Sequence, residues 1–165
     1  MIQVLLGDIF TTKADYFISS GNVLLNMSGG VNGGLLELYG VALQRELHDE
    51  IKRLSIKSVN PGYCYKFQAK IGSYESVVYS VGIDGWYESS QSLVIKTIHG
   101  ALDIMSPLSG GIVVVPAIGT GYGKLSKAEF GIALKDIIVP NGVTLVVVEK
   151  NEIGYNQIVK SYEGK

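Results

Sequence analysis

The sequence predicts a three-layer α/β/α domain in which a mixed central sheet of about six strands lies between two layers of helices. Short runs rich in Val, Ile and Tyr alternate along the chain with segments whose apolar residues recur every three to four positions. Two of the runs, residues 111–115 and 144–148, are apolar without alternation, which is typical of strands covered on both faces. Alternation of strands and helices favours a sheet between helical layers.

Each element follows from local composition. Strands are expected where β-branched and aromatic residues are bounded by turn residues. Amphipathic helices are expected where apolar residues keep helical spacing. The expected strands cover residues 2–6, 16–19, 63–69, 76–81, 111–115 and 144–149, and the expected helices cover 35–47, 93–105 and 130–138, with a shorter fourth helix after Asn151. No repeat or linker interrupts this pattern, so residues 1–165 are expected to form a single domain.

Composition and charge exclude several classes of protein. A formal charge of −1 gives no long-range field to attract nucleic acid or an anionic membrane. The single Cys64 excludes an internal disulfide, and with two distant histidines it does not make a zinc site of the usual kind. No apolar run is long enough to span a bilayer. We expect a monomeric cytoplasmic protein without a metal or cofactor, in which Cys64 is an inert thiol and His48 and His99 are ordinary helix residues.

The 21 glycines concentrate in two clusters, residues 28–34 and 119–123. The first cluster precedes an expected helix, and the second lies between an expected strand and the helix after it. In an open α/β sheet such loops gather at the carboxyl ends of the strands, and glycine lets backbone N–H groups turn toward an anion. The clusters therefore predict a phosphate site, the alternative being two tight turns.

Neither glycine cluster is a standard nucleotide fingerprint. Gly123 and Lys124 are followed by Leu125, so no Walker A motif is present, and residues 119–123 fall one position short of G-x-G-x-x-G. Kinase, GTPase and NAD-dehydrogenase interpretations therefore lose their support. The polar candidates beside the expected strand ends are few: Asp8, Ser19, Ser20, Asn22 and Asn32.

Five short motifs, in order and at matching spacing, resemble the macro domain family. They are Gly7-Asp8-Ile9, residues 14–22 (ADYFISSGN), residues 29–33 (GGVNG), residues 78–82 (VYSVG) with Trp86, and residues 115–121 (VPAIGTG). Family members bind ADP-ribose, and many hydrolyse ADP-ribose derivatives. The resemblance covers nearly the whole chain and implies the macro domain fold.

The resemblance also implies roles for individual residues. Asp8 would accept a hydrogen bond from the adenine amino group, with the Ile9 backbone beside it. Asn22 would contact the distal ribose hydroxyls, since a carboxamide both donates and accepts. The backbones of two segments would line the diphosphate: Gly29, Gly30, Val31 and Asn32, and Gly119, Thr120, Gly121 and Tyr122. Ile118 and Gly123 are the remaining implied ligand-binding residues.

Asn32 is the most consequential departure from the family pattern. Many hydrolytic members carry an aspartate at this position that helps to activate water, and a carboxamide is no general base. Gly123 replaces an aromatic residue that packs on the distal ribose, a ring that Tyr122 could supply, and Val148 replaces an aromatic over adenine. Residues 119–125 also resemble the loop of a divergent branch that removes ADP-ribose from DNA or glutamate, although that branch's lysine and aspartate are not evident.

Three functions remain open at this point. The leading hypothesis is a mono-ADP-ribosyl hydrolase or O-acetyl-ADP-ribose deacetylase, in which Asn22 and Asn32 serve catalysis and the substrate's own phosphate assists the attacking water. The second is a non-catalytic reader of ADP-ribose or of an NAD metabolite, and the third is an α/β domain without a ligand. The expected partner is ADP-ribose or an ADP-ribosylated macromolecule, which includes nucleic acid only if it is itself ADP-ribosylated.

Overall fold

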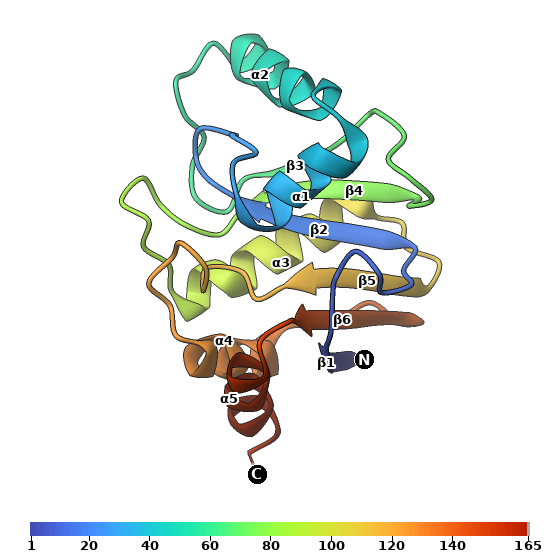
Figure 1. Ribbon diagram of the computed structural model, residues 1–165, viewed down its shortest axis with the longest axis vertical. Coiled ribbons are helices and arrows are strands. Elements are labelled where there is room, and N and C mark those ends of the chain that lie inside the picture. The colour runs from blue at the N-terminus through green and yellow to red at the C-terminus, as the bar shows by residue number, and fades with distance from the viewer. Residues whose placement is uncertain (165) are drawn as a thin grey trace.

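The computed structural model describes residues 1–164, so that Lys165, the last residue of the predicted domain, lies outside the described residues. One six-stranded sheet runs in the order β1-β6-β5-β2-β4-β3 (Figure 1). The elements in chain order are β1 (Ile2–Leu6), β2 (Tyr16–Gly21), α1 (Gly30–Tyr39), α2 (Ala42–Leu54), β3 (Cys64–Lys66), β4 (Ser76–Val81), α3 (Gln91–Met105), β5 (Gly111–Pro116), α4 (Lys127–Ala133), the 3₁₀ helix η1 (Leu134–Asp136), β6 (Val143–Glu149) and α5 (Glu152–Glu163).

The sheet is mixed. Neighbouring strands from β1 across to β4 pair in parallel, and only the edge strand β3 runs antiparallel to its neighbour β4. The connections from β2 to β4, from β4 to β5 and from β5 to β6 contain helices, as crossovers between parallel strands commonly do. The predicted α/β fold with a mixed sheet of six strands is confirmed.

Two hydrophobic cores lie on opposite faces of the sheet. Successive strand residues point to opposite faces, so Phe17 of β2 packs with Leu35 and Leu47 of α1 and α2. The next residue, Ile18, packs in the other core with buried residues of α3, α4 and α5 such as Ile98. Figure 1 shows α1 in front of β2 and α3 behind it. Coverage of both faces explains why the central strands are apolar without alternation.

The expected helix over residues 35–47 is in fact two helices. α1 ends at Tyr39, and Gly40 has a φ of 93°, a left-handed value that favours glycine and that no α-helix contains. The Gly40 N–H donates to the Leu36 carbonyl at 2.9 Å and closes the last turn of α1. The apolar spacing continued across this break because α1 and α2 pack against the same core.

Several other elements differ from the sequence prediction. Strand β3 covers three residues instead of 63–69, because the backbone N–H groups of Gln68 and Ala69 donate to the Glu46 carboxylate rather than to a strand. The helix expected over 130–138 begins at Lys127, ends at Ala133 and continues as one 3₁₀ turn. The last helix has 12 residues and is longer than the 7-residue α4, so the expectation of a short fourth helix was wrong. Among the residues that the structure describes, none of the helices is long and apolar enough to cross a membrane.

Gly131 allows α4 and α5 to approach closely. A Cβ at Gly131 would lie 2.6 Å from the Ile158 carbonyl oxygen of α5, a backbone atom that moves only with its helix. We expect Gly131→Ala to lower the free energy of unfolding by about 1–3 kcal/mol, the usual cost of overpacking, as measured by urea denaturation. Gly33→Ala in α1 is the control, because no atom lies within 4 Å of its Cβ and alanine favours helix. Equal stability of Gly131→Ala and the parent would contradict the described packing.

Candidate functional site

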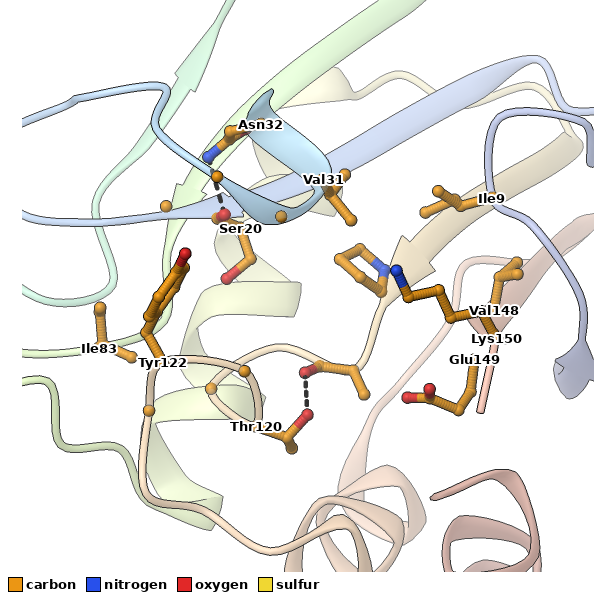
Figure 2. A pocket seen from close by; sticks show the side chains of 18 of the residues that line it. Ile9, Ser20, Val31, Asn32, Ile83, Thr120, Tyr122, Val148, Glu149 and Lys150 are labelled. Atoms are coloured by element: carbon orange, nitrogen blue, oxygen red, sulfur yellow. Dashed lines mark hydrogen bonds between the residues drawn. The ribbon is translucent and has the colours of Figure 1, made fainter. Parts of the chain in front are cut away.

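A cavity of about 830 Å³ opens where β1, β2, β5 and β6 end, at the carboxyl edge of the parallel strands (Figure 2). Its volume lies in the range of about 300–1,000 Å³ that small-molecule sites occupy. The segments that line it are far apart in sequence but follow neighbouring strands. They include residues 7–10, 20–22, 28–32, 116–117, 119–123 and 148–150.

The structure brings almost all of the predicted site residues to this one cavity. Asp8, Asn22 and Asn32 line it together with the glycine loops. Ile118 does not: its side chain is fully buried in the core on the α3 face, where it packs against Gly82. The predicted residues that line the cavity are Asp8, Ile9, Asn22, Gly29, Gly30, Val31, Asn32, Gly119, Thr120, Gly121, Tyr122 and Gly123.

Asp8 begins a tight turn at the end of β1. Its Oδ1 accepts the Phe10 N–H at 2.8 Å, and its carbonyl accepts the N–H groups of Thr11 and Thr12. The exposed carboxylate thus both shapes the turn and faces the cavity. Ile9, buried, gives this end of the cavity an apolar wall together with Val148 (Figure 2).

An ion pair between Lys127 and Glu149 borders the same end of the cavity. The Glu149 side chain is only 8% exposed, and its Oε1 accepts the Asn151 N–H at 2.9 Å. Gly154 leaves room for the pair, since a Cβ there would lie 3.3 Å from both side chains. Sequence reasoning missed this pair because its members lie 22 residues apart in elements that carry no motif.

The Asn22 side chain folds its own loop. Its Oδ1 accepts the N–H groups of Leu24 at 3.1 Å and Asn26 at 3.3 Å, and its Nδ2 donates to the Asn26 carbonyl at 3.3 Å. One Nδ2 hydrogen remains for a ligand. Asn26 also lines the cavity and was not predicted; its position four residues after Asn22 was the only available signal.

Tyr79 holds this loop against the sheet. Its buried phenol oxygen accepts the Asn22 N–H at 2.9 Å and lies 3.0 Å from the Asn26 carbonyl, to which it donates. Burial raises the pKa of Tyr79 well above its ordinary value, so the phenol keeps its proton. A Cβ on Gly21 would overlap the Tyr79 ring, which explains the glycine at the end of β2.

Asn32 presents a buried acceptor without a partner. Its side chain is 2% exposed, and its Nδ2 donates to the Ser20 carbonyl at 2.8 Å (Figure 2). Its Oδ1 has no hydrogen-bond partner among residues 1–164. A buried acceptor without a partner is costly, so a ligand hydroxyl or a water that donates to Oδ1 would be favoured.

The second glycine loop contains glycines of two kinds. Gly119 has a φ of 79° and lies close to Ser89, and a Cβ on Gly123 would overlap the Gly119 carbonyl, so the fold requires both. Gly121 has no positive φ, and no atom lies within 4 Å of the position of its Cβ. The protein's own packing therefore does not explain Gly121, which faces the cavity.

The two glycine loops approach each other through Tyr122. Its hydroxyl lies against Gly29, whose φ of 67° and missing side chain leave it room. Figure 2 shows the Tyr122 ring rising from the second loop toward the first. Although close to both loops, the ring is 70% exposed, so a ligand has access to it.

The remaining candidates lie away from the cavity. The Cys64 thiol donates to the Gly62 and Thr97 carbonyls, and burial raises its pKa to about 12. His99 accepts the Ile138 N–H through Nε2, and His48 contacts Asn26. Over the described part of the chain, no three His, Cys, Asp or Glu side chains are placed to hold a metal ion.

Removal of the Tyr79 hydroxyl should destabilise the loop. Tyr79→Phe leaves the Asn22 N–H and the Asn26 carbonyl without this partner in a partly buried place, so we expect a loss of about 1–3 kcal/mol in the free energy of unfolding. Urea denaturation measures it. Tyr16→Phe is the control, because that hydroxyl bonds the exposed Glu75 and its loss should cost less than about 1 kcal/mol. Equal losses in the two variants would contradict the role of Tyr79.

Comparison with known proteins addresses the fold. No family model matches the sequence, and a search of curated proteins finds no significant match. Solved structures do match. The Oceanobacillus iheyensis macrodomain with ADP has a TM-score of 0.82 and 21% identity, over 98% of this chain and 89% of that chain. The Trypanosoma brucei macrodomain in complex with ADP-ribose has a TM-score of 0.73 and 16% identity, over 96% and 68%.

A third similar structure, the macrodomain of Mycobacterium tuberculosis DarG, has a TM-score of 0.72 and 16% identity, over 92% of this chain and 99% of that chain. Sequence identities this low support a shared fold but not a shared activity. The match nevertheless extends over 98% of this chain with a TM-score of 0.82, and so includes the strands that form the cavity. The chain therefore has the macrodomain fold, as the sequence resemblance implied.

Proposed function

We propose that this chain binds ADP-ribose in the cavity at the carboxyl edge of the sheet. The observation that carries the proposal is Gly121, a glycine that faces the cavity and that neither backbone conformation nor packing requires. A missing side chain beside a cavity leaves room for a ligand to approach the backbone. Structures of the same fold with ADP-ribose support the identity of the ligand.

The proposed orientation follows from the chemistry of each wall. The Asp8 carboxylate, which only accepts hydrogen bonds, suits the adenine amino group, and Ile9 and Val148 suit the adenine ring. Backbone N–H groups of the two glycine loops would bind the diphosphate. The distal ribose would then lie beside Asn22 and the unpartnered Oδ1 of Asn32.

Backbone groups must supply most of the phosphate binding. The lysines that line the cavity are Lys127 and Lys150, both beside the end of β6, and Lys127 is paired with Glu149. Among the residues that line the cavity, no lysine or arginine therefore lies between the two glycine loops. A site of this kind suits a diphosphate, whose oxygens take hydrogen bonds from several N–H groups at once.

Hydrolysis of a substituent on C1″ is the second candidate function. The unpartnered Oδ1 of Asn32 favours it, because this acceptor could orient a water beside the distal ribose. Recognition without hydrolysis is favoured by the distribution of acids: the carboxylates that line the cavity, Asp8 and Glu149, both lie at the opposite end, toward β1 and β6. We therefore propose ADP-ribose recognition as the primary function, with hydrolysis limited to labile esters that the substrate's own phosphate helps to cleave.

Gly121→Val tests the binding site. The branched side chain would fill the space where the diphosphate approaches, so we expect binding of ADP-ribose to fall by at least about 100-fold while the unfolding transition changes little. Isothermal titration calorimetry measures the affinity. Gly33→Val is the matched control, because its Cβ also meets no atom but lies outside the cavity lining. If Gly121→Val binds ADP-ribose as tightly as the parent, the second glycine loop is only a turn.

Asn32→Asp tests hydrolysis. A carboxylate at this position loses the donor to the Ser20 carbonyl and is repelled toward the cavity, where it could deprotonate water. We expect this variant to hydrolyse O-acetyl-ADP-ribose and mono-ADP-ribosylated glutamate about 10²–10⁴-fold faster than the parent, and Asn22→Ala to be slower than the parent. A fast parent that is indifferent to both substitutions would place the chemistry elsewhere. A parent without turnover, in which Asn22→Ala costs only affinity, is a reader.

A further inference from the structure

A second, smaller pocket of about 270 Å³ adjoins the distal end of the cavity. Asn22 and Tyr87 line both, so the two spaces are neighbours. The small pocket falls below the volume of about 300 Å³ at which independent ligand sites begin, which makes it suitable for one group of a larger ligand. Its other lining residues are Val23, Leu24, Ser58, Asp84 and Gly85.

The wall of this pocket that follows β4 is a well-ordered loop. Asp84 Oδ1 accepts the N–H groups of Trp86 at 2.8 Å and Glu88 at 2.9 Å, and the Asp84 N–H donates to the Glu88 carbonyl. Glu88 also pairs with Lys124 at 3.2 Å, which ties the loop to the second glycine loop. These bonds hold Tyr87 at a φ of 61°, a value that aromatic residues rarely adopt.

The same loop exposes two aromatic residues, and one of them, Tyr87, lines both the cavity and the small pocket. Tyr87 is 51% exposed, and Trp86, the single tryptophan of the chain, is 81% exposed. Large aromatic side chains exposed beside a cavity are typical of binding surfaces, because burying them on a ligand is favourable.

The small pocket carries a negative charge. Asp84 is the only charged residue among those that line it, and its Oδ2 has no hydrogen-bond partner in the described part of the chain. The nearby ammonium of Lys124 is paired with Glu88 and lies outside the lining. A free carboxylate oxygen beside an aromatic ring attracts cations and repels phosphates and carboxylates. The aliphatic side chains of Val23 and Leu24 add an apolar wall that suits a flat group.

We propose that this pocket binds a planar cation carried on C1″ of the ADP-ribose. The proposal rests on the proposed function, because it takes the distal ribose to lie beside Asn22. Two groups share this chemistry: the pyridinium ring of an oxidised nicotinamide dinucleotide and the guanidinium of an ADP-ribosylated arginine. Asp84 would attract the positive charge, and Tyr87 would contact the flat face.

The test compares ligands that differ in the charge of one ring. Calorimetry on the full chain with NAD⁺ and NADH should give about tenfold tighter binding of NAD⁺, since NADH has the same shape with a neutral ring. Asp84→Asn should reduce that ratio to less than about twofold while leaving the affinity for ADP-ribose unchanged. The asparagine Oδ1 still accepts the Trp86 and Glu88 N–H groups, so the loop is retained.

Two further variants control the experiment. Glu88→Gln removes a carboxylate from the same loop but outside the pocket, and it should keep the tenfold ratio. Tyr87→Leu removes the ring at the same backbone strain, and it should lower the affinity for NAD⁺ more than that for NADH. Fluorescence of Trp86, one residue from Tyr87, should change on addition of NAD⁺ and much less on addition of ADP-ribose.

ADP-ribosylarginine distinguishes the two sources of the cation. If it shows the Asp84-dependent preference and NAD⁺ does not, the occupant is a guanidinium. If ADP-ribose binds but NAD⁺ is not preferred over NADH and Asp84→Asn does not weaken either cationic ligand, or if Asp84→Asn leaves the preference intact, the inference is wrong and the proposed function stands. If neither ADP-ribose nor the cationic ligands bind, both proposals fail.

Discussion

Parallel pairing of neighbouring strands is the constraint on which the site depends. Because β1, β6, β5 and β2 run in the same direction, the segments that follow them meet at one edge of the sheet. Register makes this convergence specific: Leu6 lies opposite Glu149, and Pro116 opposite Val148. The turn at Asp8, the second glycine loop and the Lys127–Glu149 pair are thus neighbours for a reason that lies in the sheet. A shift of one residue in β6 would turn its core residues toward the opposite face and separate these segments.

The glycines of the two loops serve different purposes, and their surroundings separate them. In the loops, Tyr122 and the Gly119 carbonyl occupy the space of a side chain at Gly29 and Gly123, as Tyr79 does at Gly21 at the end of β2. These glycines let the loops pack on one another and shape the cavity. Gly121 meets nothing, and its missing side chain affects only the cavity itself. A glycine-rich sequence alone does not make this distinction, because the neighbouring groups come from remote parts of the chain.

The fold was more predictable than the site. Apolar runs such as that of β5 and the helical spacing of α3 reflect burial directly, so both elements were predicted nearly to the residue. Local spacing did not reveal the break at Gly40, because the helices on either side of it share one core. Glycine loops and polar residues at strand ends identified about half of the cavity lining. The Lys127–Glu149 pair and the contact of Tyr79 with Gly21 could not be predicted from the sequence, because both join residues that only the tertiary structure brings together.

The distribution of charge in the cavity bears on how a ligand would be selected. Both lysines and the buried Glu149 lie at the β6 end, the middle is lined by backbone and Tyr122, and Asp84 lies beyond the distal end. A dinucleotide diphosphate would therefore owe its affinity in the middle to short-range hydrogen bonds, which depend on geometry more than on ionic strength. Discrimination between related ligands would then arise at the two ends, where carboxylates distinguish donors and cations from anions. Under the proposed function, this division would let a chain with a net charge of −1 bind a doubly charged diphosphate without a basic patch.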